Sequence, residues 1–207
     1  MTKFFDPLDY ENLGASIARA LDEQPVLPLE DLEPFDGVGI YALYYSGDFP
    51  CYEILSNENQ QEPGSWAIYI GKAEAENARK GDPEQANKPL GPKLYKRILD
   101  HRNSIVDAEN LNVHDFQVRA LTVAPTWVPL AEVVAIRMHK PAWNVIVAGL
   151  GNHNPGAGRK AGTRPRWDTL HPGRSWAVQL RDRVETVNDI EQAVVQYLET
   201  HCERFRH

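Results

Sequence analysis

Two short apolar segments in the first half of the chain have the residue pattern of β-strands. Residues 38–45 read Val-Gly-Ile-Tyr-Ala-Leu-Tyr-Tyr, and residues 66–72 read Trp-Ala-Ile-Tyr-Ile-Gly-Lys. β-Branched and aromatic residues favour strands, in which successive side chains point to opposite faces, so Ile40 and Tyr41 are predicted on opposite faces of a sheet. Apolar and polar residues also alternate over 115–123, which predicts a third strand.

Apolar residues at helical spacing predict four helices, over residues 10–22, 92–105, 128–136 and 188–202. The first is followed by Pro25, Pro28 and Pro34, and we expect it to form an arm or docking helix outside the main folding unit. Residues 46–65, between the first two strands, have the Gly, Pro and Asn content of a loop, and residues 73–92 have the same character. Both segments are therefore predicted as long loops.

The composition is that of a chain with one hydrophobic core. It has 207 residues, of which 42% are hydrophobic, too few for two large domains. Cys51 and Cys202 are too far apart in sequence to suggest a metal site or a disulfide framework. No apolar run has transmembrane length, and the acidic N-terminus does not resemble a signal peptide. We expect a soluble, cytoplasmic protein that has no membrane partner.

The net charge of −7 is concentrated at the N-terminus. Residues 1–36 carry two basic and nine acidic side chains, so the rest of the chain sums to zero. Within that remainder, residues 72–102 have eight basic against five acidic side chains, and residues 148–176 have five against one. A local positive field suits nucleic acid, although any one basic run could equally be a solvated surface.

Both predicted strands place a tyrosine near a glycine, which is typical of close approach by backbone or ligand. If the strands pair, Tyr41 and Tyr69 can converge on one place. On the helix that follows, Arg97 and His101 are one turn apart along the edge of the apolar stripe, so they should border the core. A surface Arg–His pair is the simpler alternative, and the two tyrosines decide against it.

Glu132 is the single charged residue in the segment 128–136. A lone carboxylate on an apolar stripe is costly unless an opposite charge compensates it. A divalent cation is one good partner. The alternative is that Glu132 reaches solvent or Arg97.

Six residues, together with the motifs Gly39-Ile40-Tyr41 and Tyr69-Ile70-Gly71, resemble the GIY-YIG nuclease superfamily in type and order: Tyr41, Tyr69, Arg97, His101, Glu132 and Asn144. Residues 141–144 and 151–159 are further similar to the small GIY-YIG type II restriction endonucleases that target CCGCGG. With that branch included, the likeness extends from about residue 37 to residue 176.

The resemblance implies an α/β (α+β) fold, in which a three-stranded, largely antiparallel sheet is flanked by helices. Residues 1–36 would form an acidic arm, residues 37–150 the nuclease core, and residues 151–207 a basic Gly-rich loop and a helix packed on the core. Residues 148–176 look too polar to pack in a core. We expect basic residues of this segment to contact DNA, namely His153, Arg159, Lys160, Arg164, Arg166 and Arg174.

The resemblance also implies hydrolysis of DNA phosphodiester bonds with one Mg²⁺ per active site, held by Glu132. Tyr41 is then the candidate general base. Because a free phenol has a pKa of about 10, Lys72, His101 or the field of the metal must draw its proton away.

Three further roles follow from the same resemblance. Arg97 would bind the phosphate with its planar donors. Tyr69 would orient the water or the phosphate, and Asn144 would brace the site.

The expected partners are double-stranded DNA, a second copy of the chain in a homodimer, and a cognate DNA methyltransferase that protects host sites. A repair-type or homing-type nuclease is the runner-up within enzymes. A DNA-binding module whose catalytic pocket has decayed is the alternative of a different class. The histidines do not fall at ligand spacing, which disfavours a zinc nuclease.

Overall fold

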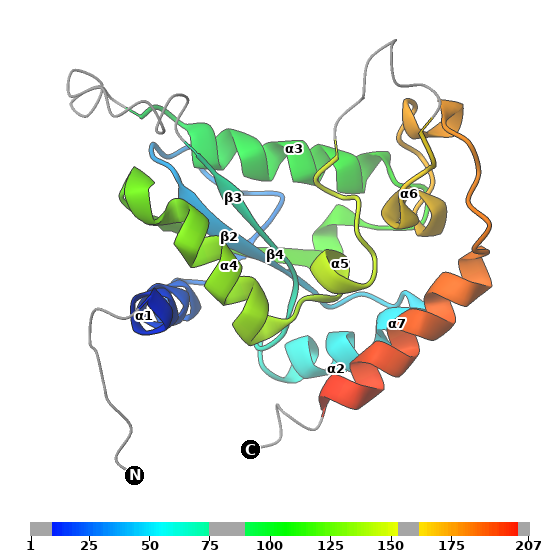
Figure 1. Ribbon diagram of the computed structural model, residues 1–207, viewed down its shortest axis with the longest axis horizontal. Helices are drawn as coiled ribbons and strands as arrows, with labels where there is room; N and C mark the ends of the chain where they lie inside the picture. The colour runs from blue at the N-terminus through cyan, green and yellow to red at the C-terminus, as the bar shows by residue number, and fades with distance from the viewer. Residues whose placement is uncertain (1–9, 75–89, 153–161, 203–207) are drawn as a thin grey trace.

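The computed structural model describes residues 10–74, 90–152 and 162–202, in which an antiparallel sheet is flanked by helices (Figure 1). The sheet order is β1-β4-β2-β3, and every pair of neighbours is antiparallel. Its strands are β1 (Leu27–Pro28), β2 (Gly39–Tyr45), β3 (Ala67–Ala73) and β4 (Phe116–Thr122). The α+β class and the antiparallel sheet are confirmed. The short strand β1 was not predicted, because two residues beside a proline have no strand pattern.

The helices have the following bounds: α1 (Tyr10–Asp22), α2 (Glu53–Gln61), α3 (Lys93–Asp107), α4 (Val128–His139), α5 (Ala142–Val145), α6 (Arg166–Leu170) and α7 (Val187–Cys202). All four predicted helices are present, with ends that differ by three residues at most. At the start of α7, the Thr186 backbone N–H donates to the Asp189 carboxylate and the Asp189 N–H donates to the Thr186 hydroxyl. This reciprocal cap explains why the helix begins there.

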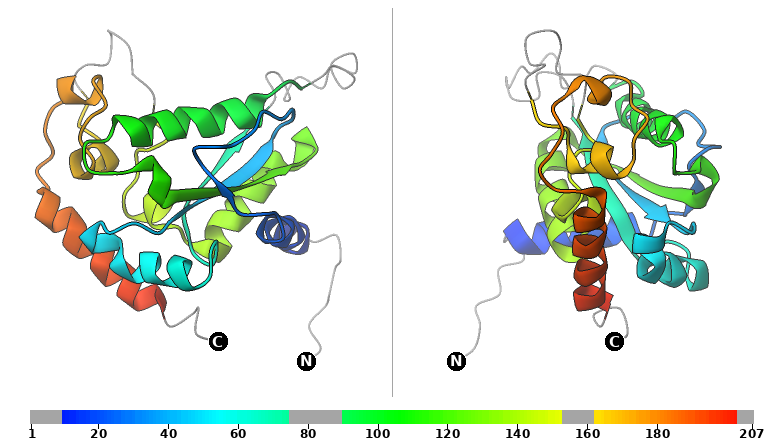
Figure 2. Two further views of the ribbon diagram at one scale, coloured as in Figure 1. Left: turned by 180° about the vertical axis from the view of Figure 1, so that it is seen from behind. Right: turned by 90° about the vertical axis from the view of Figure 1, so that its right-hand side faces the viewer.

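The central strand β2 is buried on both faces, and Ile40 and Tyr41 lie on opposite faces, as predicted. Tyr41, Leu43 and Tyr45 belong to the apolar cluster on the side of α3, whereas Ile40 and Ala42 belong to the cluster on the side of α1 and α4. Figures 1 and 2 show α3 crossing one face of the sheet and α4 lying against the other. Alternate residues of β2 thus pack into two different apolar clusters.

The prediction of a loop over residues 46–65 is wrong, because this segment contains helix α2 and, before it, a 3₁₀ turn, η1 (Pro50–Tyr52). The polar residue Asn59 is only 1% exposed. Its carboxamide donates to the carbonyls of Tyr45 and Trp66 and accepts from the Trp66 N–H. Asn59, whose residue type contributed to the prediction of a loop, is therefore the link between α2 and the sheet.

The segment around α6 also packs into the core, which corrects the expectation that residues 148–176 are too polar to do so. Trp167 and Leu170 are at most 1% exposed and belong to the cluster on the side of α3. Arg174 and Asp168 are buried beside them as an ion pair. Residues 73–92 were predicted as a second loop, and residues 75–89 lie outside the described residues.

Residues 10–32 contribute to both apolar clusters, whereas the sequence suggested a helix outside the catalytic unit. Ala18 and Leu21 of α1 pack with Ala131 and Ala135 of α4. Leu29, just after β1, belongs to the opposite cluster. Within the described residues, no helix combines the length and the apolar character that crossing a membrane would require.

Candidate active site

The two tyrosines of the sequence motifs meet on the α3 side of the sheet, as predicted. Strands β2 and β3 pair in a register that sets Tyr41 opposite Gly71 and Leu43 opposite Tyr69. The ring centroids of Tyr41 and Tyr69 lie 6.1 Å apart. Antiparallel pairing therefore brings together two phenols that are separated by 27 residues of sequence.

Gly71 is required because the ring of Tyr41 covers it. A Cβ added at Gly71 would overlap the Tyr41 hydroxyl and would lie 2.9 Å from Cε1 of Tyr69. Gly39 is required for a different reason, since its Cβ would overlap the backbone carbonyl oxygen of Leu121 on β4. The two motif glycines thus allow close packing of a ring in one case and of a strand in the other.

Helix α3 adds Arg97 and His101 to the tyrosine pair. His101 is 1% exposed, and its ring centroid lies 5.7 Å from that of Tyr41 and 5.1 Å from that of Tyr69. Arg97 is partly buried, and its guanidinium donates to the carbonyl of Gly151 at 3.2 Å. The prediction that this pair borders the core is confirmed, and the alternative of a surface pair is excluded for His101.

Glu132 and Lys72 form an ion pair on the other side of the same strands. Lys72 is the register partner of Ile40, which points toward α4. Its ammonium lies 3.1 Å from Oε2 of Glu132 and 2.7 Å from Oε1 of Glu74. The compensating charge that Glu132 needs is thus Lys72, a partner that the sequence did not suggest. Because β3 is an edge strand, the site extends from one face of the sheet around this edge to the other.

Electrostatics keep both phenols protonated in the protein alone. Complete burial raises the pKa of Tyr41 well above its usual range, and the nearby Tyr69 and Glu132 add to this effect while Arg97 opposes it. The pKa of Tyr69 is also raised, mainly by burial. Burial disfavours the charged form of Lys72, yet its hydrogen bonds to the two carboxylates outweigh this and raise the Lys72 pKa. Lys72 is therefore a cation and a poor acceptor for the Tyr41 proton.

Asn144 of α5 is fixed to the outer edge of β3. Its carboxamide oxygen accepts from the Ile70 N–H at 2.8 Å, and its nitrogen donates to the Ile70 carbonyl at 2.8 Å. Both backbone groups of Ile70 are satisfied in this way, one residue from Tyr69. The position of Asn144 agrees with a bracing role.

Gly151 is a member of the cluster that sequence reasoning missed. A Cβ at this position would lie 3.1 Å from the Tyr69 hydroxyl, 3.3 Å from Nη2 of Arg97 and 3.9 Å from Cε1 of His101. The residue acts through its backbone carbonyl, which accepts from Arg97. No side-chain pattern reveals a backbone acceptor, and the one available signal was its position at the start of the Gly-rich segment.

The residues predicted to contact DNA fall into two groups. His153, Arg159 and Lys160 lie outside the described residues. Arg164, Arg166 and Arg174 are engaged within the fold. Arg164 pairs with Asp182 at 2.9 Å, and Arg166 pairs with Glu185 and donates to the Ile146 carbonyl.

Arg174 is 3% exposed and pairs with Asp168 at 2.6 Å. Burial makes this placement unsuitable for a direct contact with DNA, which corrects the expectation for Arg174. The prediction failed because the Asp168 carboxylate neutralises the Arg174 charge and several backbone carbonyls accept its hydrogen bonds. In a Gly-rich sequence such an arginine looks exposed.

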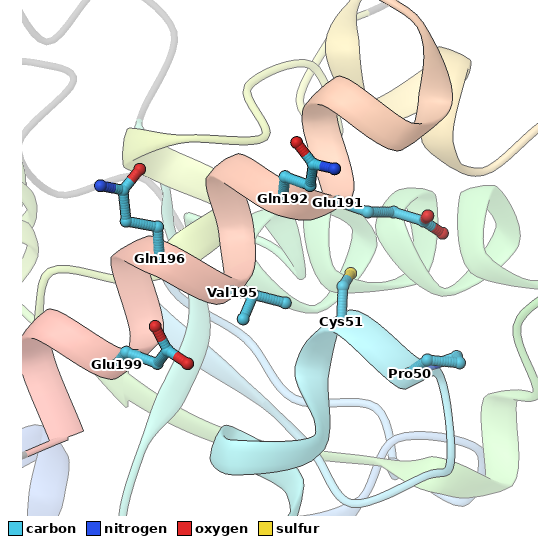
Figure 3. A pocket seen from close by; sticks show the side chains of 7 residues that line it. All are labelled: Pro50, Cys51, Glu191, Gln192, Val195, Gln196 and Glu199. Carbon is cyan, nitrogen blue, oxygen red and sulfur yellow. The ribbon is translucent and has the colours of Figure 1, made fainter.

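One cavity of the described structure lies away from the tyrosine cluster. A pocket of about 360 Å³ lies between η1 and α7, and Figure 3 shows Cys51 and Val195 lining it together with the carboxylates of Glu191 and Glu199. Its lining contains no basic side chain. A pocket of this charge does not suit a phosphate, so the chemistry is assigned to the cluster on β2, β3 and α3.

Glu132 is the carboxylate best placed to hold a divalent cation beside the tyrosines. Its side chain is 22% exposed, and its charge raises the pKa of both Tyr41 and Tyr69. Among the described residues, no three His, Cys, Asp or Glu side chains come together at metal-ligand distance. This donor set does not suit zinc, but it fits Mg²⁺, which takes one or two carboxylates and completes its coordination with water and phosphate oxygens.

Comparison with known protein families supplies the deciding observation, because the model of the Eco29kI GIY-YIG domain matches residues 33–198. The chain belongs to the Eco29kI GIY-YIG domain family. The matched region includes all of the sheet except β1, and it contains the tyrosine cluster, Glu132, Asn144 and Gly151. Members of the Eco29kI GIY-YIG family are restriction endonucleases, so the chain is a GIY-YIG nuclease that acts on DNA. A search of the curated proteins finds no matching relative.

Proposed function

We propose that this protein is a Mg²⁺-dependent type II restriction endonuclease that hydrolyses both strands of DNA at a short palindrome, for which CCGCGG is the candidate. The observation that carries the proposal is the cluster of Tyr41, Tyr69 and His101, with Arg97 at its border and Glu132 at the adjacent strand edge. In-line attack on a phosphodiester needs an activated water, neutralisation of the phosphate and help for the leaving oxygen. The cluster contains candidate groups for the first two of these needs.

In the proposed mechanism, Arg97 binds a non-bridging phosphate oxygen and Tyr69 orients the reacting groups. Tyr41 must lose its own phenolic proton before it can accept one from the attacking water. Because burial raises the Tyr41 pKa in the protein alone, that loss requires positive charge nearby. Mg²⁺ held by Glu132 would supply that charge and would polarise the phosphate. His101 is the side chain in ring contact with Tyr41 that can relay its proton.

A homodimer is proposed because one chain contains one such cluster. A palindrome presents two equivalent phosphates related by a two-fold axis, and a two-fold dimer places one active site at each. Light scattering of a catalytically inactive variant on a short palindromic duplex tests this arrangement, and a mass of one chain per duplex would contradict it. A cognate methyltransferase that modifies the same palindrome is the expected partner in the cell.

The test of the activity is incubation of the purified protein with plasmid DNA and Mg²⁺, followed by sequencing of the DNA ends. The expected result is that every pair of ends, when rejoined, reconstitutes the same short palindrome. Ends without a common palindrome would favour a repair-type or homing-type nuclease instead. Binding without any cutting would indicate a DNA-binding module with an inactive site.

The metal assignment predicts that Glu132→Gln reduces cleavage by at least about 10³-fold, since a lost transition-state charge interaction is worth several kcal/mol, while DNA affinity is retained. Glu74→Gln is the matched control, because Glu74 also pairs with Lys72, whereas Glu132 is the carboxylate whose charge reaches both phenols. Single-turnover cleavage should separate the two variants. Equal losses in both would show that the pairing with Lys72, and not a metal, explains the importance of Glu132.

A further inference from the structure

We propose that Arg174 is a positioning residue for Arg97, and that it acts by fixing the turn whose Gly151 carbonyl holds the Arg97 guanidinium. The inference rests on the proposed role of Arg97 as the phosphate ligand. It assigns a buried basic residue to the catalytic arrangement although that residue touches neither DNA nor the reacting atoms.

The guanidinium of Arg174 has acceptors for all five of its N–H groups. Nε and Nη2 donate to the two oxygens of Asp168 at 2.7 and 2.6 Å. Nη2 also donates to the carbonyl of Gly149 at 3.0 Å, and Nη1 donates to those of Leu150 at 2.9 Å and Asn152 at 3.3 Å. With the Ser104 hydroxyl at 3.5 Å from Nη1, the donors of Arg174 are fully used.

Three of these acceptors are the carbonyls on either side of Gly151. The fourth carbonyl of the turn, that of Gly151 itself, points the other way and accepts from Arg97. The turn is closed by a hydrogen bond from the Asn152 N–H to the Gly149 carbonyl at 3.0 Å. A turn held at three carbonyls by one planar group has little freedom to rotate the remaining carbonyl, so the position of Arg97 depends on Arg174.

The Arg174 guanidinium is itself held between two rings. Its central carbon lies 4.5 Å from the ring centroid of Trp167 and 4.7 Å from that of Trp176. Burial disfavours the charge of Asp168 and raises its pKa, while Arg174 opposes this shift. Pairing, stacking and burial together give a planar donor of fixed orientation, for which the point charge of lysine is no substitute.

The experiment compares Arg174→Lys with Arg166→Lys in the full chain. Arg166 is the matched control, because it also pairs with a carboxylate and donates to one backbone carbonyl, but its partners among the described residues are Glu185 and Ile146 and not the turn at 149–152. The first readout needs neither DNA nor metal. Side-chain ¹⁵N spectra of the arginines, with Arg97 identified by the signal lost in Arg97→Lys, report the environment of that guanidinium.

We expect Arg174→Lys to shift or broaden the Arg97 signal and Arg166→Lys to leave it in place. In single-turnover cleavage at saturating DNA, Arg174→Lys should slow the reaction about 10- to 100-fold, since misplacing a reacting group by about 1 Å costs this much. The salt dependence of DNA affinity should not change. A direct phosphate contact would instead reduce the slope of log affinity against log salt by about one.

Trp176→Leu is the second variant, in case Arg174→Lys does not fold. It removes one of the two stacked rings, is only partly buried, and should move the Arg97 signal in the same direction by less. An unmoved Arg97 signal in the folded variants, or a reduced salt slope for Arg174→Lys, overturns the inference. If the wild-type protein fails to cut DNA, the proposed function fails, and the spectra still decide whether Arg174 positions Arg97.

Discussion

The core on the α3 side of the sheet contains two clusters of aromatic rings, each around a buried histidine, and they differ in how their polar atoms are satisfied. One consists of Tyr41, Tyr69 and His101, and the other of Tyr52, Trp143 and His171. Ring centroids lie 5.1–6.1 Å apart in the first cluster and 5.7–6.1 Å apart in the second. His101 and His171 are each at most 1% exposed. Ring geometry and burial therefore do not distinguish a catalytic cluster from a structural one.

The second cluster is a closed network of neutral groups. The Trp143 indole donates to the Tyr52 hydroxyl at 2.7 Å, and that hydroxyl lies 2.8 Å from Nε2 of His171. Nδ1 of His171 lies 3.0 Å from Oδ1 of Asn110, whose amide nitrogen donates to the Leu170 carbonyl. Because Oδ1 of Asn110 can only accept, the proton of neutral His171 is on Nδ1, and Tyr52 donates to Nε2.

The first cluster is bordered by charges. Arg97 and Glu132 act on both phenols with opposite effects on their pKa values, and Gly151 leaves space where a side chain would otherwise intrude. A buried network whose groups satisfy one another contributes to stability and specificity of packing. A cluster whose electrostatic balance changes when an anion or cation arrives is the one suited to catalysis.

The strongest test of this difference removes one tyrosine hydroxyl from each cluster. Tyr41→Phe should lower the cleavage rate by about 10²–10⁴-fold, the range for loss of a general base, with no loss of thermal stability. Tyr52→Phe should leave cleavage within a few-fold but lower the free energy of unfolding by about 1–3 kcal/mol, because Trp143 and His171 lose their partner. Single-turnover kinetics and denaturant titration measure the two effects. Near-normal cleavage by Tyr41→Phe would show that another group activates the water.

The pH dependence of the free energy of unfolding tests whether His171 of the second cluster is neutral. Burial lowers the His171 pKa to about 3, whereas an unfolded histidine titrates near 6.5. Between these values the unfolded chain binds the extra proton, so stability is complete above about pH 6.5 and falls as the pH decreases, by at most about 1.4 kcal/mol per pH unit.

Denaturant titration at pH 7.5, 6 and 5 measures this slope, and His171→Gln serves as the reference because it does not titrate. The wild type should lose more stability than the variant between pH 7.5 and 5. Equal slopes in the two proteins would mean that His171 is not held neutral by burial.

The smallest expected effect concerns two arginines, one that is satisfied within the fold and one that is expected to contact DNA. Arg166 has its partners within the fold, in Glu185 and the Ile146 carbonyl, so Arg166→Ala should reduce stability and leave the salt dependence of DNA affinity unchanged. Arg159 lies outside the described residues and keeps its proposed role at DNA. Arg159→Ala should reduce the salt slope by about one. The opposite pattern would place the DNA contact at Arg166.

Period and spacing were enough to predict β2, β3 and β4, the helices α1, α3, α4 and α7, and the position of Arg97 and His101 at the border of the core, whereas the tyrosine motifs and the family resemblance brought His101 to Tyr41 and Tyr69. These features depend on local geometry, since alternation along a strand and 100° per helical residue fix the direction of each side chain. The partners of polar residues were not predictable in this way. Lys72 meets Glu132 only through the pairing of β3 with β2 and the packing of α4, and Asn59 is buried only because α2 docks on the sheet.

Composition was a poor guide to structure wherever polar residues are satisfied inside the fold. The basic Gly-rich segment looked like a DNA-contacting surface, yet Arg174 is among its most buried residues. The role of Gly151 rests on a backbone carbonyl, which every residue has and no sequence pattern marks. Buried polar networks and backbone acceptors are thus the part of this site that the sequence does not reveal.

The carboxamide of Asn144 has a consequence for how copies of this protein can assemble. By filling the donor and acceptor of Ile70, it occupies the outer edge of β3, where a strand from another molecule would otherwise add. The opposite edge is the two-residue strand β1, which ends in Pro28 and offers few backbone donors. Extension of one sheet into the next is therefore disfavoured at both edges, and we expect any contact between two copies to involve helices and loops instead.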